Sequence, residues 1–239
     1  MSNLAMMMGL GSAGGGSIPS FVGFANGAAA NGGAVTVDLS TIGIESGDLI
    51  IGAHYASRTY DLRPRMSISS TGYTLITSGY ANWSYDISAE IYGKIADGTE
   101  TTFVSDALNP SDIGASCVTL VGVFRGVGST IPTDLASGLL QSGVATGTDD
   151  ISWTGVTGLT SSDTIVCIGG VATVSAGILY DTPTDLDGFQ SLGRNDSSDT
   201  TAAMGYKYIT GDSFSPETWT IAATSSSSVH YAMIKLTSV

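Results

Sequence analysis

Along most of the chain, apolar residues alternate with small or polar ones. In residues 34–40, small or polar residues alternate with Val35, Val37 and Leu39. This two-residue period is typical of a strand with one buried face. Gly, Asn, Asp, Ser or Pro separates this stretch from others rich in Val, Ile, Thr and aromatic residues, and no stretch keeps an apolar 3.6-residue period for three helical turns. The pattern therefore predicts an all-β protein with almost no helix. The further strands that it predicts are residues 48–56, 73–80, 87–96, 117–124, 164–174, 201–210, 217–224 and 229–237.

The two halves of the chain resemble each other. Residues 34–53 align with residues 150–169, and residues 91–106 align with residues 205–222, at an offset near 115 residues. Each half then closes with a long apolar strand. Internal similarity at a constant offset is the mark of a duplicated unit, so the sequence predicts two copies of one β unit.

A single copy has only four or five convincing strands, and a sheet of that size leaves one apolar face open to water. We therefore expect the copies to cover each other as one jelly-roll-like β-sandwich around a pseudo-two-fold axis. The alternative is two independent sandwiches, which need more strands than the pattern shows. The predicted organisation is an arm at residues 1–17, a first repeat at 18–126, a linker at 127–149 and a second repeat at 150–239.

Composition limits the partners. Eight basic residues stand against 21 acidic ones, for a formal net charge of −13, and such a surface repels the phosphates of nucleic acids. Only 12% of the residues are charged, so Ser, Thr, Asn and Gly must supply most of the polar surface. No apolar run reaches the ~20 residues of a membrane-spanning helix. We expect neither nucleic acid nor a membrane among the partners.

The first 17 residues form an apolar knot followed by a glycine tract. No Lys or Arg precedes Leu4, and the apolar stretch that ends at Leu10 only reaches the lower limit for a signal peptide. Methionine side chains adapt well to irregular apolar grooves. We interpret this segment as an anchoring arm that inserts into a partner protein through Met6, Met7, Met8 and Leu10.

Four short motifs at turns and strand ends connect the chain with a known group of proteins. They are Gly47-Asp48-Leu49, Gly72-Tyr73-Thr74-Leu75, residues 92–98 and Arg125-Gly126-Val127. In these motifs, over residues 45–239, the chain resembles uncharacterised structural proteins of tailed bacteriophages and prophages. The resemblance implies a virion component assembled in the host cytoplasm, with other virion proteins and copies of itself as partners.

From this resemblance we expect a non-enzymatic protein on the particle exterior, a head decoration or fibre-type protein held by its N-terminal arm. The alternative is a tail fibre or receptor-binding adhesin that recognises host surface glycans. A hydrolase of envelope glycans is the third hypothesis, although no specific pair of carboxylates stands out among the 21 acidic residues.

Residues with catalytic or metal-binding chemistry are few. Both histidines, His54 and His230, lie in apolar strands, where a core or sheet-surface position is favoured over a catalytic base, and no Gly-x-Ser-x-Gly motif occurs. Cys117 and Cys167 lie in apolar runs and are predicted to be buried free thiols, with a disulfide as the alternative. Two His and two Cys lack the paired spacing of a zinc site. We expect no metal and no cofactor.

An acidic stretch resembles part of a calcium loop through Asp185, Asp187 and Gly188. In the register of an EF-hand loop, however, the first and twelfth positions are Pro183 and Arg194, which supply no carboxylate. A plain acidic turn is therefore favoured, and whether Asp185 and Asp187 bind calcium stays open.

Two loops are candidates for binding a host glycan or a protein partner. Residues 57–65 carry three of the eight basic residues, which suits a carboxylate-rich partner or an anionic glycan; the alternative is a solvated loop whose arginines pair with the chain's own acids. Residues 80–86 hold three aromatic residues around an expected hairpin tip, as in sugar-stacking sites and protein interfaces; the alternative is that only the tryptophan is exposed. The candidate residues are Arg58, Tyr60, Arg63 and Arg65 in the first loop and Tyr80, Trp83 and Tyr85 in the second.

Overall fold

The computed structural model describes residues 18–29, 33–58, 66–83, 85–107, 116–128, 138–173, 179–194, 199–221 and 227–238. The prediction of an all-β fold with almost no helix is confirmed, because these residues form fifteen strands in antiparallel sheets. Within these ranges, no helix is long and apolar enough to cross a membrane.

Five strands from the first half of the chain form one central sheet. Its order is β1 (Ser20–Ala29), β8 (Ser116–Arg125), β3 (Leu49–Arg58), β6 (Asp86–Ile95) and β5 (Thr74–Ala81). Neighbouring strands are antiparallel throughout. Strand β8 is buried along almost its whole length, as expected of a strand with apolar layers on both faces.

Five strands from the second half form the other central sheet. Its order is β9 (Leu139–Thr146), β15 (Ser228–Thr237), β11 (Asp163–Thr173), β13 (Asp199–Tyr208) and β12 (Gly188–Arg194). Taken in chain order within each half, the strands occupy the same places in the two sheets. The registers agree as well: Leu49 is paired with Ile95 and Phe124, and Thr164 is paired with Tyr208 and Leu236.

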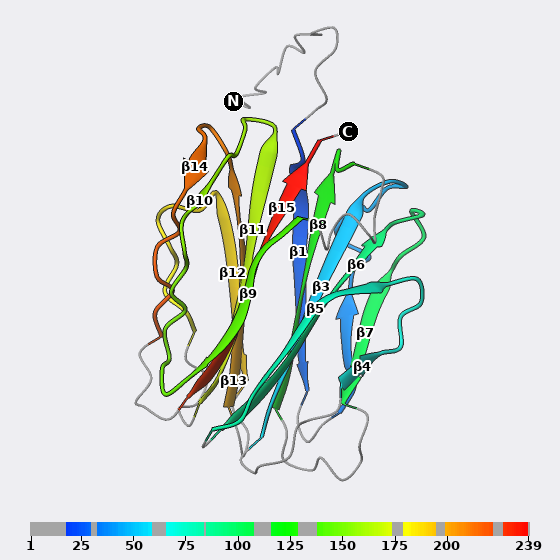
Figure 1. Ribbon diagram of the computed structural model, residues 1–239. Helices are drawn as coiled ribbons and strands as arrows, with labels where there is room; N and C mark the ends of the chain where they lie inside the picture. Colours follow the sequence, from blue (N-terminus) through cyan, green and yellow to red (C-terminus); the bar gives the residue numbers. More distant parts are fainter. Residues whose placement is uncertain are drawn as a thin grey trace, which may run out of the picture.

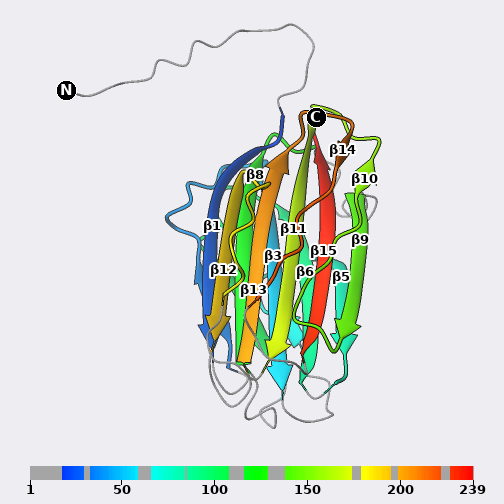
Figure 2. The same cartoon turned by 90° about the vertical axis from the view of Figure 1, so that its left-hand side faces the viewer.

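The two central sheets pack face to face (Figure 1, Figure 2). Alternate side chains of their middle strands form the core between them, including Leu49 and Ile51 from β3 and Val166 from β11. Tyr55 and Gly170 occupy equivalent positions in β3 and β11 and lie against each other. A Cβ atom on Gly170 would lie 2.5 Å from Cδ1 of Tyr55, so glycine at this position makes room for the aromatic ring.

Each central sheet also has a covering layer on its outer face. On the first sheet this layer is a three-stranded sheet in the order β2 (Val35–Asp38), β7 (Thr102–Ala107) and β4 (Met66–Ile68). Phe103 of this layer packs with Val121 and other outward-facing side chains of the central sheet.

On the second sheet the covering layer is less regular. It contains the strand pair β10 (Val156–Thr157) and β14 (Ser213–Phe214) and an isolated bridge between Ile151 and Trp219. These residues form a separate core with the outward-facing side chains of the central sheet. Within each half, the chain thus passes repeatedly between a large layer and a small one.

Two expectations from the sequence need correction. Residues 139–146, assigned to a linker, form β9 at the edge of the second central sheet. The expected strand at 217–224 is, over its described part, only the bridge at Trp219. The two central sheets do cover each other, and each also has a covering layer on its outer face, which the sequence pattern did not indicate.

The two ends of the sandwich differ. At one end Ser20 pairs with Arg125 and Asp163 pairs with Thr237, so the chain enters and leaves the sandwich there, and we call this the terminal end (Figure 1). The hairpin between β5 and β6 lies at the opposite end, which we call the loop end. At the loop end the Thr200 hydroxyl donates to the Ser116 carbonyl oxygen at 2.9 Å and so ties the two sheets together.

Candidate functional sites

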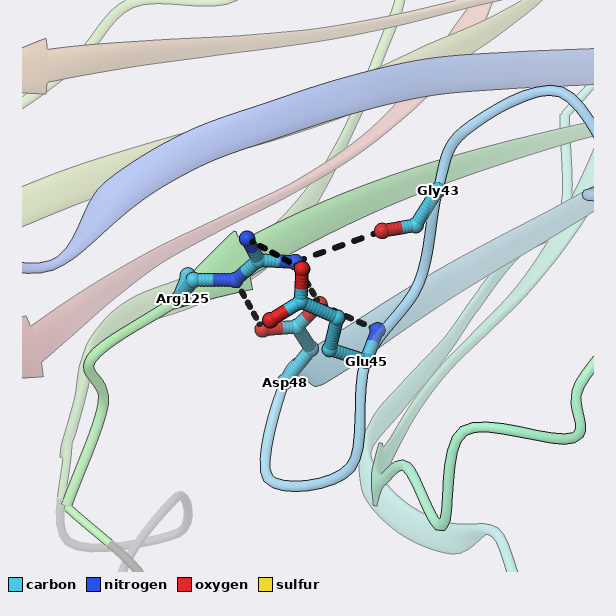
Figure 3. A network of polar contacts seen from close by, with 4 residues as sticks. All are labelled: Gly43, Glu45, Asp48 and Arg125. Carbon is cyan, nitrogen blue, oxygen red and sulfur yellow. Dashed lines mark hydrogen bonds and ion pairs between the residues drawn. The ribbon is translucent and has the colours of Figure 1, made fainter.

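Arg125, the last residue of β8, is the centre of a polar network at the terminal end (Figure 3). Its Nε donates to Oδ1 of Asp48 at 2.8 Å, and its Nη2 donates to Oδ2 of Asp48 at 2.9 Å. Nη1 lies 3.0 Å from Oε1 of Glu45, and Nη2 also reaches the Gly43 carbonyl oxygen at 3.2 Å. The two-pronged contact with Asp48 fixes the orientation of the guanidinium group.

Asp48 organises the loop that precedes β3. Its carboxylate accepts the Glu45 N–H at 2.8 Å and is only 2% exposed, whereas the Arg125 side chain is 40% exposed. Burial by itself raises the pKa of Asp48, but the hydrogen bonds from Arg125 and from the Glu45 N–H, with the charge of Arg125, outweigh burial and lower that pKa. Asp48 is therefore ionised at neutral pH and joins the start of β3 to the end of β8.

The network brings together motifs that are far apart in the sequence. Asp48 and Arg125 belong to two of the four turn and strand-end motifs singled out in the sequence, and Ala96 belongs to a third. The Ala96 N–H donates to the Asp48 carbonyl oxygen at 2.7 Å, and the Gly47 N–H donates to the Ala96 carbonyl oxygen at 2.9 Å. The three motifs are thus joined by hydrogen bonds at the terminal end. The sequence alone does not predict this joint, because each motif has only the pattern of a separate turn or strand end.

Asp163 occupies the equivalent position in the second half of the chain. Its Oδ2 accepts the Thr160 N–H at 2.8 Å and the Thr160 hydroxyl at 3.1 Å. Its Oδ1 accepts the hydroxyl of Thr237, the counterpart of Arg125, at 3.2 Å. Equivalent buried carboxylates are therefore held differently in the two halves: neutral hydroxyls hold Asp163, and a guanidinium group holds Asp48.

A hollow of about 360 Å³ opens beside the covering layer of the first half. Nζ of Lys94 lies there, 2.7 Å from Oε1 of Glu100 and 5.8 Å from the centre of the Tyr73 ring. Burial and the charge of Glu100 raise the pKa of Tyr73, whose hydroxyl is buried and has no hydrogen-bond partner in the described part of the chain. The hollow has the size of a small-ligand site. The remaining lining is mostly hydroxyl side chains, from Ser69, Ser70, Thr71, Thr99, Thr101 and Thr102.

The second half fills the corresponding position differently. By the strand registers, Asp187 stands where the first half has Tyr73, and Lys207 stands where it has Lys94. Oδ1 of Asp187 accepts a hydrogen bond from Nζ of Lys207 at 3.0 Å, and its Oδ2 accepts the Tyr208 N–H at 2.7 Å. The Asp187 carboxylate therefore forms an ion pair with Lys207 and also accepts a backbone hydrogen bond from Tyr208.

The other residue of the calcium hypothesis, Asp185, has a contact of its own. Its Oδ2 accepts the Glu217 N–H at 2.8 Å. Among the residues that the structure describes, no three His, Cys, Asp or Glu side chains are grouped so that they could hold a metal ion.

The tip of the β5–β6 hairpin presents one of its three aromatic candidates to solvent. Trp83 is 50% exposed, whereas Tyr85 packs against the core between the sheets. Oδ2 of the buried Asp86 accepts the Tyr80 hydroxyl at 2.9 Å, and its Oδ1 accepts the Trp83 N–H at 3.2 Å. Asp86 thereby holds the backbone of the tip in place and leaves the indole ring exposed.

The remaining candidates from the arginine-rich loop and the N-terminal arm are not placed. Arg58 ends β3 and pairs through its backbone with Asp86, but its side chain is not described. The residues that lie outside the described ranges are Met6, Met7, Met8, Leu10, Tyr60, Arg63 and Arg65.

Both histidines are completely buried in strands. Nδ1 of His54 lies 2.7 Å from the Thr119 hydroxyl and 3.0 Å from the Ser105 hydroxyl, and Nδ1 of His230 lies 3.4 Å from the Tyr55 hydroxyl. Burial lowers the pKa of each histidine to about 4. Both are therefore neutral core residues at neutral pH.

Both cysteines are buried, and neither forms a disulfide. Cys117 belongs to the core under the first covering layer and Cys167 to the core under the second. Burial, with a smaller contribution from the charge of Asp185, raises the pKa of Cys167, so this thiol stays protonated and unreactive at neutral pH.

Comparison of the chain with protein-family models, with curated proteins and with solved structures finds no match.

Proposed function

We propose that the protein is a non-enzymatic component on the exterior of a phage-like particle, a head decoration or fibre-type protein held by the residues that precede Ile18. The observation that carries this proposal is the opposed placement of two features. The Thr164 hydroxyl donates a hydrogen bond to the Pro19 carbonyl oxygen at the terminal end, whereas the β5–β6 hairpin, which carries the exposed Trp83, lies at the loop end. A body that is fixed through its N-terminal arm therefore turns its loop end outward.

The way the chain winds supports the same role. Within each half the chain passes between a large and a small layer, and antiparallel two-layer folds include the jelly rolls that recur in viral capsid and lectin domains. Because one fold serves many functions, this winding supports the proposal only together with the sequence motifs and the placement of the ends.

The arm has the composition of a multivalent anchor. Met6, Met7, Met8 and Leu10 contribute ~1.5–3 kcal/mol each if fully buried in a partner groove. Ordering the glycine-rich segment that follows offsets much of this gain, because glycine loses the most backbone freedom. Retention of the protein on a particle therefore depends on many copies that bind side by side.

Deletion of residues 1–17 tests the anchor. Because β1 begins only at Ser20, we expect the truncated chain to keep its melting temperature and to lose incorporation into particles, measured by co-sedimentation and by electron cryo-microscopy of purified particles. The substitutions Met6→Ser, Met7→Ser and Met8→Ser in the full-length chain are the matched control for the length of the arm. A truncated chain present on particles at full occupancy overturns the anchor, and a truncated chain that does not fold shows that the arm belongs to the core.

A second function, a receptor-binding adhesin, is favoured by Trp83. A half-exposed indole on a hairpin tip held by Asp86 is suited to stack on a sugar ring. Under this alternative, Trp83→Ala and Arg63→Ala weaken attachment to host cells without lowering the melting temperature. Leu179, which is 49% exposed, provides the control substitution Leu179→Ala. Attachment that is unchanged by Trp83→Ala and Arg63→Ala contradicts the adhesin function and leaves the decoration function in place.

A further inference from the structure

The four outer strands of the two central sheets share an unusual composition. Strands β1 and β5 are the edges of the first sheet, and β9 and β12 are the edges of the second. In these four strands Arg194 is the single charged residue, and there is no proline. Edge strands of monomeric proteins usually carry charges or proline that prevent pairing with another chain. Their near absence here, in a chain of net charge −13, indicates edges that are built for pairing.

One side of the sandwich combines two such edges. Strands β5 and β9 run next to each other on this side (Figure 1, Figure 2), and the hydroxyls of Thr77 and Ser142 lie 2.9 Å apart. In the described part of the chain, β5 pairs only with β6 and β9 pairs only with β15. From Thr77 to Ala81 and from Ser142 to Thr146, both strands have regular registers with these neighbours. Each therefore presents an ordered row of outward N–H and C=O groups.

Exposed apolar side chains lie on the same side. Leu75 of β5 is 46% exposed and Val144 of β9 is 44% exposed, and these are two of the five large apolar side chains that are exposed among the described residues. A side with open backbone groups, no charge and exposed apolar groups has the character of an interface.

We propose that the side formed by β5 and β9 binds the same side of a second copy of this chain. A two-fold axis normal to the sheets sets β5 antiparallel to the partner's β5, and at the same time sets β9 antiparallel to the partner's β9. Both sheets then continue across the interface without a break. Such an isologous contact closes on itself and produces a dimer rather than a fibre.

The geometry selects a second copy over other occupants. Two open edges lie side by side at the distance between stacked sheets, ~10 Å, so a single added peptide strand fills only one of them. A partner that fills both must carry two edges at the same spacing, as this chain does. Charge favours the same partner, because two molecules of charge −13 repel each other least where neither has a charged side chain. The inference does not depend on the particle role, because a dimer can form in either case.

Sedimentation velocity of the full-length chain over a range of concentrations tests the proposal. We expect conversion from a species of 24.3 kDa to one of twice that mass. Hydrogen exchange is expected to show slower amide exchange at high concentration, confined to Thr77–Ala81 and Ser142–Thr146.

The discriminating variant is Ser78→Lys with Ser142→Lys, at two exposed positions of these strands. Like charges that face each other across paired strands are unfavourable, so we expect dimerisation to weaken roughly tenfold or more. The matched control is Thr36→Lys with Thr157→Lys, at exposed positions of the covering layers. Both variants reduce the net negative charge by two units, so a general charge effect would strengthen association in both.

The other outcomes overturn the proposal. A chain that stays at 24.3 kDa at every concentration, or an edge variant that dimerises as well as the control, excludes this interface. Concentration-dependent protection on β1 and β12 places the contact on the opposite side of the sandwich. Protection of β5 alone, without dimerisation of this chain and only in the presence of another protein, identifies a single added strand instead of a second copy. If the edge variant does not fold, the exchange pattern of the unmodified chain decides.

Discussion

In the first half of the chain, a guanidinium group from Arg125 holds the buried carboxylate of Asp48 by two hydrogen bonds, whereas in the second half the hydroxyls of Thr160 and Thr237 hold Asp163. Both carboxylates also accept the N–H of the residue three positions earlier. The backbone needs an acceptor at the start of the central strand, and aspartate supplies it in both halves. The two halves differ in the groups that face this carboxylate. Among the described residues, Asp48 is paired with the cation Arg125, whereas the side chains that bond to Asp163 are neutral.

The same divergence appears where β5 and β12 begin. Lys94 pairs with Glu100 beside the Tyr73 ring in the first half, and its counterpart Lys207 pairs with Asp187 in the second. In the second half, an acid at the position of the tyrosine takes the lysine directly. In the first half, the lysine pairs instead with Glu100, in a hollow lined mostly by hydroxyl side chains. Equivalent strands therefore carry different surfaces, and a binding function of either surface belongs to one half only.

The largest expected effect concerns the two buried histidines, one in each central sheet. Because burial lowers the pKa of His54 and of His230 to about 4, the unfolded chain takes up protons near pH 6.5 and the folded chain does so only near pH 4. Stability is therefore complete above about pH 6.5 and is lost as the pH falls towards 4, by about 3 kcal/mol for each histidine. Urea denaturation at a series of pH values measures this loss.

Single substitutions measure the contribution of each histidine in that experiment. His54→Gln and His230→Gln should each remove about half of the pH dependence between pH 6.5 and 4. A loss that one substitution removes completely would show that the two histidines differ in protonation, and a flat profile in the unmodified chain would contradict the burial of both.

The next largest effect comes from the two aspartate joints. Arg125→Met leaves the Asp48 carboxylate buried without its cation, and we expect it to lower the free energy of unfolding by about 3 kcal/mol. Thr237→Val removes one hydroxyl donor from Asp163 while the Thr160 donors remain, and we expect a loss of about 1 kcal/mol. Guanidinium chloride denaturation at pH 7 measures both. Equal losses would mean that the charge of Arg125 adds nothing to the joint.

The smallest effect concerns the two lysine pairs. Lys94 and Glu100 are 18% and 6% exposed, whereas Lys207 and Asp187 are 29% and 33% exposed. Solvent screens the second pair more, so Lys94→Met should cost about 1 kcal/mol and Lys207→Met about 0.5 kcal/mol. Thermal unfolding at low and high salt concentration tests the order, because added salt should reduce both losses. A larger loss for Lys207→Met would contradict the expectation that the less exposed Lys94–Glu100 pair contributes more to stability.

The sequence was sufficient for the fold class and for most of the core strands. Alternation of apolar and polar positions predicted the all-β fold, and the expected strand at 87–96 is found as β6 at Asp86–Ile95. The buried environment of His54 could be predicted as well, because its neighbours along the chain are apolar. These features depend on residues close in sequence, whose pattern determines which faces of a strand can be buried.

Strands β1 and β9 were missed as separate elements because glycine and alanine dilute their apolar pattern. The reason for the small residues is visible only in the packing. A Cβ on Gly27 would lie 2.9 Å from Cγ1 of Val35, and a Cβ on Gly143 would lie 2.7 Å from the Tyr231 hydroxyl oxygen. Gly27 makes room for the covering layer, and Gly143 makes room for the tyrosine ring of its partner on the adjacent strand. Such close contacts select small residues that weaken the strand signal in the sequence.

The contacts that define the candidate sites were decided by the tertiary structure alone. Arg125 and Asp48 are 77 positions apart, and nothing in the spacing of their motifs indicates that they meet. The exposure of Trp83 beside the burial of Tyr85, and the adjacency of β5 and β9, likewise depend on how separate strands stack. Local sequence determines which segments become strands and which of their faces are apolar, because the pleat has a period of two residues. Which strands become neighbours depends on contacts between distant parts of the chain, and these form only when the whole sandwich is assembled.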